Sequence, residues 1–143
     1  MSFNHKFNTV VSGDARGGLE YWSAKTKKAP KKGVKFSFKG ETDLFAVQKT
    51  KGRVSSICHN HDGTNFVVTA SDFQVRVFKY TTGKLRRVYD ESPGVYEDAH
   101  VEGALGIDDM DYGRRMAVER ELRNSTTVPP SNAIFDQTGH FIL

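Results

Sequence analysis

The sequence predicts an all-β fold, namely an incomplete β-propeller of two blades and the start of a third, with one inserted α-helix. Three observations predict it: a pattern that repeats at a constant offset of 56 residues, alternating strands joined by tight turns, and a long insertion after the second repeat. The 143 residues are 37% hydrophobic and 27% charged, a composition typical of one globular domain.

The first repeat is expected over about residues 3–48 and the second over about residues 54–90. Residues 3–22 align with residues 59–78 without a gap, and each copy has a turn, an apolar pair and an alternating strand. In the first copy "FNHKFNTVVS" precedes "GGLEYW", and in the second "HNHDGTNFVV" precedes "FQVRVF". This agreement predicts that both copies form the same antiparallel unit.

Small polar turns separate the expected strands. Asp62 and Gly63 favour a hairpin, because Gly reaches positive φ without steric cost and Asp bonds nearby backbone amides. A second turn in "YTTGKL" leads to a fourth strand at Leu85–Tyr89, and the first copy is expected to have its fourth strand at Leu44–Gln48. Four short strands per repeat favour a propeller blade over a sandwich.

A third copy is expected over about residues 131–143, where "AIFDQTGHFIL" matches "ICHNHDGTNFV" with Gly139 opposite Gly63. The last residues are apolar and β-prone, so we expect a truncated product or an excised fragment. Two blades and a stub do not close a ring, since closed propellers have roughly four to eight blades. We therefore expect open strand edges, weak stability and a tendency to associate.

The insertion, at about residues 92–128, is too long for a simple loop between strands. We expect Asp111 to cap a helix over Tyr112–Arg123, with Pro129 and Pro130 ending it. Acidic residues before the helix and an arginine at its end suit the helix dipole.

Two interpretations of this helix, "GRRMAVEREL", stay open. In the first, an apolar side formed by Met116, Val118 and Leu122 packs against the sheets. In the second, guanidinium groups form a surface for a protein or RNA partner, because they match carboxylate and phosphate geometry. The residues of this arginine surface are Arg114, Arg115, Arg120 and Arg123.

A lysine-rich loop, "SAKTKKAPKKGVK", interrupts the first repeat. Its Pro and Gly residues and its charge predict an exposed, flexible loop, with a phosphate-binding arm as the alternative. No aromatic residues are interleaved to stack on bases, which disfavours nucleic acid. The net charge of +4 permits an acidic partner without requiring one.

The sequence lacks patterns for catalysis, metal binding or membrane insertion. Cys58 is the single cysteine and is expected to be an inert, buried thiol. His59 and His61 have no third ligand at a suitable spacing, so we expect no metal and no cofactor. No nucleophile and base can be assembled, which predicts no small-molecule substrate. Without a signal-peptide or membrane-length apolar run, the protein is expected to be intracellular and away from membranes.

The segments "VSGDARGGLEYW", "VTASDFQVRVFKYTTGKLRRVYDES", "DDMDYGRRMAVERELRN" and "NAIFDQTGHFIL" together resemble one family. It is that of the peptidylprolyl isomerase domain and WD repeat-containing proteins, nuclear cyclophilins with an N-terminal WD-repeat propeller. The resemblance covers about Phe3 to Leu143, and "GRRMAVEREL" is its most specific part. The usual Trp-Asp pair and a Gly-His pair are missing. The resemblance implies structural blade positions at Asp62, Gly63, Asp72, Trp22 and Phe78.

The resemblance implies a non-catalytic protein-interaction scaffold, part of the propeller of a spliceosome-associated cyclophilin. The resemblance implies a nuclear location and splicing-factor partners, with direct RNA contact as the alternative. Catalysis in the family belongs to a C-terminal cyclophilin domain with motifs such as "FHRII" and "GSQFFI", which do not occur here. We therefore expect this chain not to be an enzyme. The alternative is a peptidyl-prolyl cis-trans isomerase whose catalytic domain is lost or encoded elsewhere.

Overall fold

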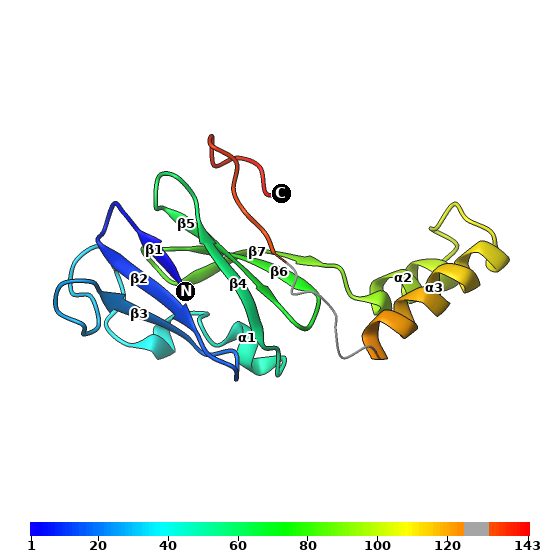
Figure 1. Ribbon diagram of the computed structural model, residues 1–143, viewed down its shortest axis with the longest axis horizontal. Helices are drawn as coiled ribbons and strands as arrows, with labels where there is room; N and C mark the ends of the chain where they lie inside the picture. The colour runs from blue at the N-terminus through cyan, green and yellow to red at the C-terminus, as the bar shows by residue number, and fades with distance from the viewer. Residues whose placement is uncertain (125–131) are drawn as a thin grey trace.

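The computed structural model describes residues 1–124 and 132–143, and gives the backbone alone for residues 123 and 124. The described residues are mostly β, with two antiparallel sheets and a few helices (Figure 1). The β-rich class predicted from the sequence is confirmed at this level. Within the described part of the chain, no helix is long and apolar enough to span a membrane.

The first sheet has three strands in the order β1 (Ser2–Asn4), β2 (Thr9–Gly13) and β3 (Leu19–Ser23). Burial alternates along β2 and β3, so that Val11 and its partner Tyr21 point inward. This period of two follows from the pleat of a strand and matches the alternation in "GGLEYW".

The second sheet has four strands in the order β4 (Val54–His59), β5 (Asn65–Ala70), β6 (Gln74–Lys79) and β7 (Lys84–Asp90). β7 contains the predicted fourth strand at Leu85–Tyr89. Nearly every residue of β5 is buried, which indicates that both faces of this sheet are covered.

Residues that are related by the sequence offset of 56 also occupy equivalent positions in the strand pairing of the two sheets. Val10 lies opposite Trp22 in the first sheet, and Phe66 lies opposite Phe78 in the second. Each member of the second pair follows its counterpart by that offset. The sequence repeat therefore corresponds to a repeat in register, because a slip of one residue would exchange the two faces of a strand.

The two sheets pack face to face around one apolar core. Tyr21 stacks on Tyr80 with ring centroids 5.0 Å apart, and its hydroxyl donates to the Tyr80 carbonyl at 3.1 Å. The Tyr80 hydroxyl is hydrogen-bonded to the Thr9 hydroxyl, so both tyrosine hydroxyls have partners inside the core, as buried tyrosines require. The other fully or nearly fully buried members of this core are Val11, Leu19, Leu44, Val47, Phe66, Val68, Ala70 and Phe78.

The strand predicted at Leu44–Gln48 is wrong. A short helix, α1 (Ala46–Lys49), lies there after a 3-10 turn at Lys39–Glu41. Val47 in this helix and Leu44 in the turn before it are both buried. Alternation in a strand would have placed one of them on the outer face.

Gly63 joins the two sheets through its turn. Its φ of 66° confirms the left-handed conformation predicted for this glycine. The Asn4 side chain donates to the Gly63 carbonyl at 2.8 Å, and a Cβ on Gly63 would lie only 2.4 Å from the Asn4 side-chain oxygen. Any other residue would therefore disturb the contact as well as the turn.

The insertion contains two helices where one was predicted. α2 (Pro93–Val101) and α3 (Asp109–Asn124) form a helical hairpin that extends away from the sheets (Figure 1). Pro93 occupies the start of α2, a position that favours proline. The prediction of Asp111 as the cap is wrong, because α3 begins two residues earlier and the N–H of Asp111 donates to Asp108.

The apolar side predicted for α3 does not form. Met116 is buried, but Val118 and Leu122 are 56% and 49% exposed. Val118 lies about 200° around the helix from Met116, so the two cannot share one face. α3 contacts α2, so packing of this side against the sheets is wrong. The predicted stops, Pro129 and Pro130, lie outside the described residues.

The last described segment forms a C-terminal hairpin. Ile134 and Leu143 exchange backbone hydrogen bonds of 2.9 Å, and Phe135 bridges to Ile142. Gly139 turns the chain with a φ of 72°. The hairpin packs on the second sheet, on the face opposite the first sheet, through a small apolar cluster of Ala133, Phe135 and Ile142 with Val67 and Val77.

Candidate functional site

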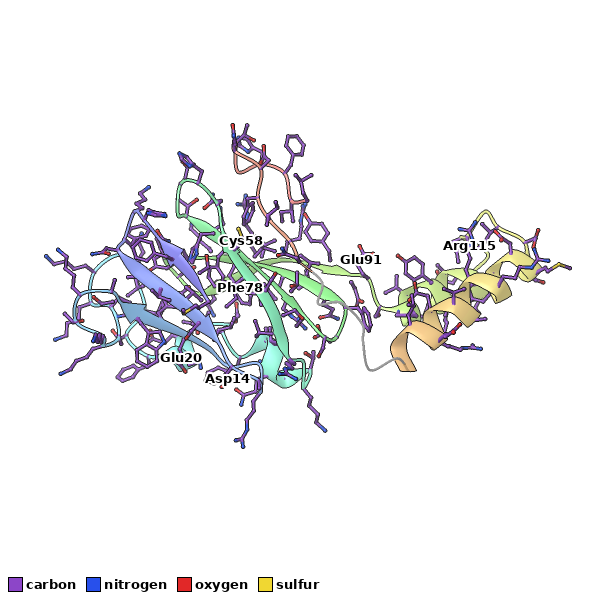
Figure 2. All side chains as sticks on the ribbon, viewed as in Figure 1. Asp14, Glu20, Cys58, Phe78, Glu91 and Arg115 are labelled. Carbon is purple, nitrogen blue, oxygen red and sulfur yellow. The ribbon has the colours of Figure 1, made fainter. Side chains whose placement is uncertain are left out.

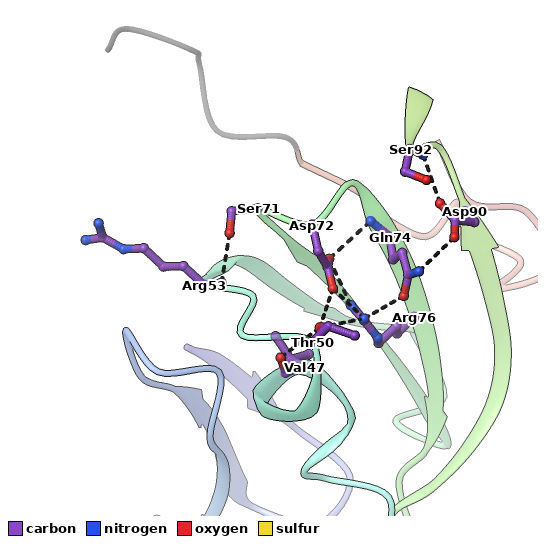
Figure 3. Close-up of polar contacts among 9 residues, drawn as sticks. All are labelled: Val47, Thr50, Arg53, Ser71, Asp72, Gln74, Arg76, Asp90 and Ser92. Atoms are coloured by element: carbon purple, nitrogen blue, oxygen red, sulfur yellow. Dashed lines mark hydrogen bonds and ion pairs between the residues drawn. The ribbon is translucent and has the colours of Figure 1, made fainter. Parts of the chain in front are cut away.

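The best-connected polar cluster surrounds Asp72, in the turn between β5 and β6 (Figure 3). The Arg76 guanidinium donates to both Asp72 oxygens, at 3.1 and 2.5 Å. Thr50 also donates to Asp72, and Arg76 reaches the side-chain oxygen of Gln74. Gln74 in turn donates to Asp90 on β7. The cluster thus ties the C-terminal end of α1 to the β5–β6 turn and to strands β6 and β7.

The Arg76 side chain is 2% exposed and that of Asp72 14%. Burial acts to raise the pKa of the Asp72 carboxyl, but hydrogen bonds from Arg76 and Thr50 and the arginine charge hold it below its usual value. Because the guanidinium is occupied by protein oxygens, the cluster supports the fold rather than offering a group to a substrate.

His59 ends β4 and faces the junction of the sheets. Its Nδ1 lies 2.8 Å from the Ser2 hydroxyl, and its ring contacts Phe66 and Tyr80. Burial lowers its pKa to about 4, so the ring is neutral at neutral pH. Its Nε2 is buried without a hydrogen-bond partner among the described residues. We find no group of three potential metal ligands in the described part of the chain.

Cys58 and His61 lie near this histidine but differ from it in exposure. Cys58 is half-buried and its thiol contacts the His59 carbonyl at 3.4 Å. It is thus less deeply placed than predicted, although it packs beside the C-terminal hairpin. His61 is exposed in the turn, with Asp62 next to it. These side chains do not converge on one point with a shared ligand geometry.

The arginine surface lies on the helical hairpin, far from the labelled core residue Phe78 (Figure 2). Arg115 pairs with Asp111 at 2.8 Å, one turn before it. Arg114 contacts Met110, and Arg120 is exposed. The side chain of Arg123 lies outside the described residues.

Charge counts weaken the RNA interpretation of this surface. Residues 93–124 contain eight Asp and Glu against four Arg. The hairpin is therefore net negative, whereas RNA binding draws its affinity from basic patches. The alternative of a protein partner for these arginines stays a prediction.

The lysine-rich loop borders an open hollow of about 830 Å³. Lys25, Lys28, Lys31 and Lys32 contribute to its wall, together with the Phe7 ring. Phe7 stacks on Tyr80 with ring centroids 4.9 Å apart, which anchors the base of the loop to the core. The lysines are mostly exposed, as predicted.

A basic-aromatic groove separates β7 from the C-terminal hairpin, and the sequence did not reveal it. Its volume is about 280 Å³. Arg87 donates to the Tyr89 hydroxyl at 3.3 Å, and its guanidinium lies 5.7 Å from that ring. The residues that line this groove include Arg86, Arg87, Tyr89, Phe135, His140 and Ile142.

No family model matches the chain. The chain is 43% identical over its whole length to peptidyl-prolyl cis-trans isomerase CYP71 of Arabidopsis thaliana, of which it covers 23%. It is 41% identical, again over its whole length, to the human peptidylprolyl isomerase domain and WD repeat-containing protein 1, of which it covers 22%. The identity with peptidyl-prolyl cis-trans isomerase cyp15 of Rhizopus delemar is 40%, over 23% of that protein.

These relatives support the resemblance in its coarse form, because the homologues carry the predicted name. They contradict the prediction of a non-catalytic scaffold and the expectation that the chain is not an enzyme. The relatives that match this chain over 93% or more of its length are named as isomerases. The isomerase alternative is therefore better supported. The chain spans less than a quarter of the length of these relatives.

Proposed function

We propose that this chain acts as part of a peptidyl-prolyl cis-trans isomerase. The observation that carries the proposal is an identity of 40% or more, along the entire chain, with proteins named for that activity. The reaction is rotation about a peptide bond before proline, so no group is transferred and no cofactor is needed.

The physical task of such an enzyme is to weaken the partial double bond of the amide. This bond gives a rotational barrier of roughly 18–20 kcal/mol, and exchange without a catalyst takes tens to hundreds of seconds. An apolar wall that takes the proline ring out of water, with a fixed donor beside the peptide, favours the twisted amide. A catalytic site therefore needs apolar or aromatic contacts next to an N–H donor.

The basic-aromatic groove has both kinds of group and is our candidate for the proline site. Phe135 and Ile142 provide apolar surface, while Arg86 and Arg87 provide donors that stay charged at neutral pH. Arg87 is held by Tyr89, and this hydrogen bond is the main reason why the pKa of Arg87 is raised. A proline ring against Phe135 would lie within reach of a guanidinium.

Two-dimensional NMR exchange on a short Xaa-Pro peptide tests the proposal. We expect the chain to raise the exchange rate well above the peptide alone, and Arg87→Ala to reduce that increase by about tenfold or more. Arg16→Ala is the matched control, since it removes an exposed arginine in a turn of the first sheet. Circular dichroism of each variant reports whether it is folded.

An exchange rate equal to that of the peptide alone, with folded wild-type chain in excess, would overturn the isomerase proposal for this chain. Acceleration that Arg87→Ala leaves unchanged would keep the activity and move the site away from the groove. The two parts of the proposal are thus tested separately.

We also infer that the two sheets are consecutive units of a WD-repeat propeller. The repeated register and the WD repeats in the name of the human relative support this inference. An experimental structure in which a further β unit covers the outer face of the first sheet would agree with it, and closure of the two sheets into one barrel would refute it. The nuclear location and the splicing partners rest on the resemblance and stay predictions.

A further inference from the structure

One cross-strand row of the first sheet is exposed although its counterpart is buried. The head row, defined as Phe3, Val10 and Trp22, runs across β1, β2 and β3 through the pairs Phe3–Val10 and Val10–Trp22. Shifted by 56 residues, the same row reads His59, Phe66 and Phe78, with the pairs His59–Phe66 and Phe66–Phe78.

The second row lies in the core against the first sheet, where Phe66 and Phe78 are 0% exposed. In the head row, Phe3 is 40% and Trp22 44% exposed, and Val10 is partly exposed. The head row thus places apolar residues on the face that, in the second sheet, is buried against the preceding sheet. A contiguous exposed apolar row of this kind indicates an interaction surface.

The Trp22 indole is prepared for burial. Its Nε1 donates to the Ser12 hydroxyl at 2.8 Å, on the same face of the sheet. A partner can therefore cover the ring without leaving an unsatisfied donor, which would otherwise cost about 1–3 kcal/mol. The N–H group of the head row is therefore already satisfied within the first sheet.

The opposite kind of face is exposed at the C-terminal hairpin. Phe135 and Ile142 point to the second sheet, so the residues that alternate with them point away from it. Ile134, Phe141 and Leu143 are 47%, 68% and 75% exposed. We define these three as the tail surface. The equivalent face of the first sheet carries Val11 and packs on the second sheet. The equivalent face of the second sheet carries Val67 and packs on the C-terminal hairpin.

We call a face equivalent to the head row a head-type face, and a face equivalent to the tail surface a tail-type face. Each described junction between units joins a tail-type face of one unit to a head-type face of the next. The first sheet meets the second in this way, and the second meets the C-terminal hairpin in the same way. The chain presents one free face of each type. We propose that the head row of one copy of this chain docks on the tail surface of a second copy.

Such a contact is heterologous, because it joins two different surfaces, and it leaves a free head and a free tail at the ends of every dimer. Association then continues until a ring closes or a filament grows. A head-to-head dimer would instead bury two identical rows and stop at two copies. The stoichiometry therefore distinguishes the proposal from simple pairing of apolar patches.

Analytical ultracentrifugation with three variants tests this. The head variant carries Phe3→Lys and Trp22→Lys, and the tail variant carries Ile134→Lys and Phe141→Lys, all at exposed positions. We expect the wild type to form species larger than a dimer at about 100 µM, where micromolar contacts are occupied. Each variant alone should be monomeric. Val118→Lys on α3, also exposed, is the control and should associate like the wild type.

Mixing the head and tail variants is the decisive measurement. The mixture retains one intact tail surface and one intact head row, so we expect a dimer of one copy of each and nothing larger. A monomeric wild type, association that survives both variants, or a mixture that stays monomeric would each overturn the proposal. Far-ultraviolet circular dichroism, which reports the backbone, identifies an unfolded variant, for which the single changes Trp22→Lys and Phe141→Lys serve instead.

Discussion

The two sheets share a register but differ in how many of their faces are covered. Glu20 in the first sheet and its counterpart in the second show this difference most clearly. Glu20 and Arg76 are equivalent by the offset of 56. The Glu20 side chain is 52% exposed and pairs with Lys39, whereas Arg76 is 2% exposed and pairs with Asp72. A repeated pattern therefore sets where a side chain lies on its strand, but the neighbouring layer sets what its interactions contribute.

The largest expected difference concerns Phe78 and its counterpart Trp22. Phe78→Ala should lower the free energy of unfolding by about 4 kcal/mol, because it removes a fully buried ring and leaves a cavity. Trp22→Ala should cost less than about 1 kcal/mol in dilute protein, since the indole is 44% exposed. Urea denaturation at low protein concentration measures both. Equal losses would mean that the outer face of the first sheet is already covered in the single chain.

A smaller difference is expected for the two ion pairs. Asp72→Ala leaves the Arg76 charge buried without its main partner, so the free energy of unfolding should fall by about 3 kcal/mol. Glu20→Ala breaks an exposed pair and should change it by less than about 1 kcal/mol. Denaturant midpoints at low and high salt report the two, and only the Glu20 pair should respond to salt. A neutral Asp72→Ala would contradict the role assigned to its cluster.

The smallest expected effect comes from pH at the junction of the sheets. Because burial lowers the pKa of His59 to about 4, the unfolded chain binds this proton first as the pH falls below about 6.5. The stabilisation is complete above that pH and is lost as the pH falls toward 4, with about 2 kcal/mol gone at pH 5. Comparing unfolding at pH 7 and pH 5 for the wild type and His59→Gln isolates this contribution. His61→Gln, exposed in the adjacent turn, should retain the wild-type pH dependence.

Much of the β architecture was predictable because it depends on local signals. Alternation marked β3 and β6, and the glycine at position 63 marked a turn that requires positive φ. The helix at Ala46–Lys49 was missed because a segment of four residues has too few apolar positions to distinguish a helical period from the period of a strand. α2 was missed although Pro93 is a helix-start signal.

The candidate sites were less predictable because they depend on contacts between distant segments. The basic-aromatic groove joins Arg87 on β7 to Phe135 in the C-terminal hairpin, and nothing in the spacing of the two residues indicates that they meet. The aspartate at position 72 was identified, but its partner Thr50 directly follows a helix that was predicted as a strand. The isomerase proposal depends on the relatives, because the sequence offered isomerase activity only as the alternative, in the absence of the known catalytic motifs.

The helical hairpin also separates charge along the molecule. Residues 93–124 carry four more acidic than basic residues, while the rest of the chain carries seventeen Lys and Arg against nine Asp and Glu. Because the hairpin projects from the sheets, the centres of negative and positive charge are displaced along the longest dimension (Figure 1). The protein should therefore behave as a permanent electric dipole that turns its sheets toward polyanions and its helices toward polycations, an orientation that rising ionic strength abolishes.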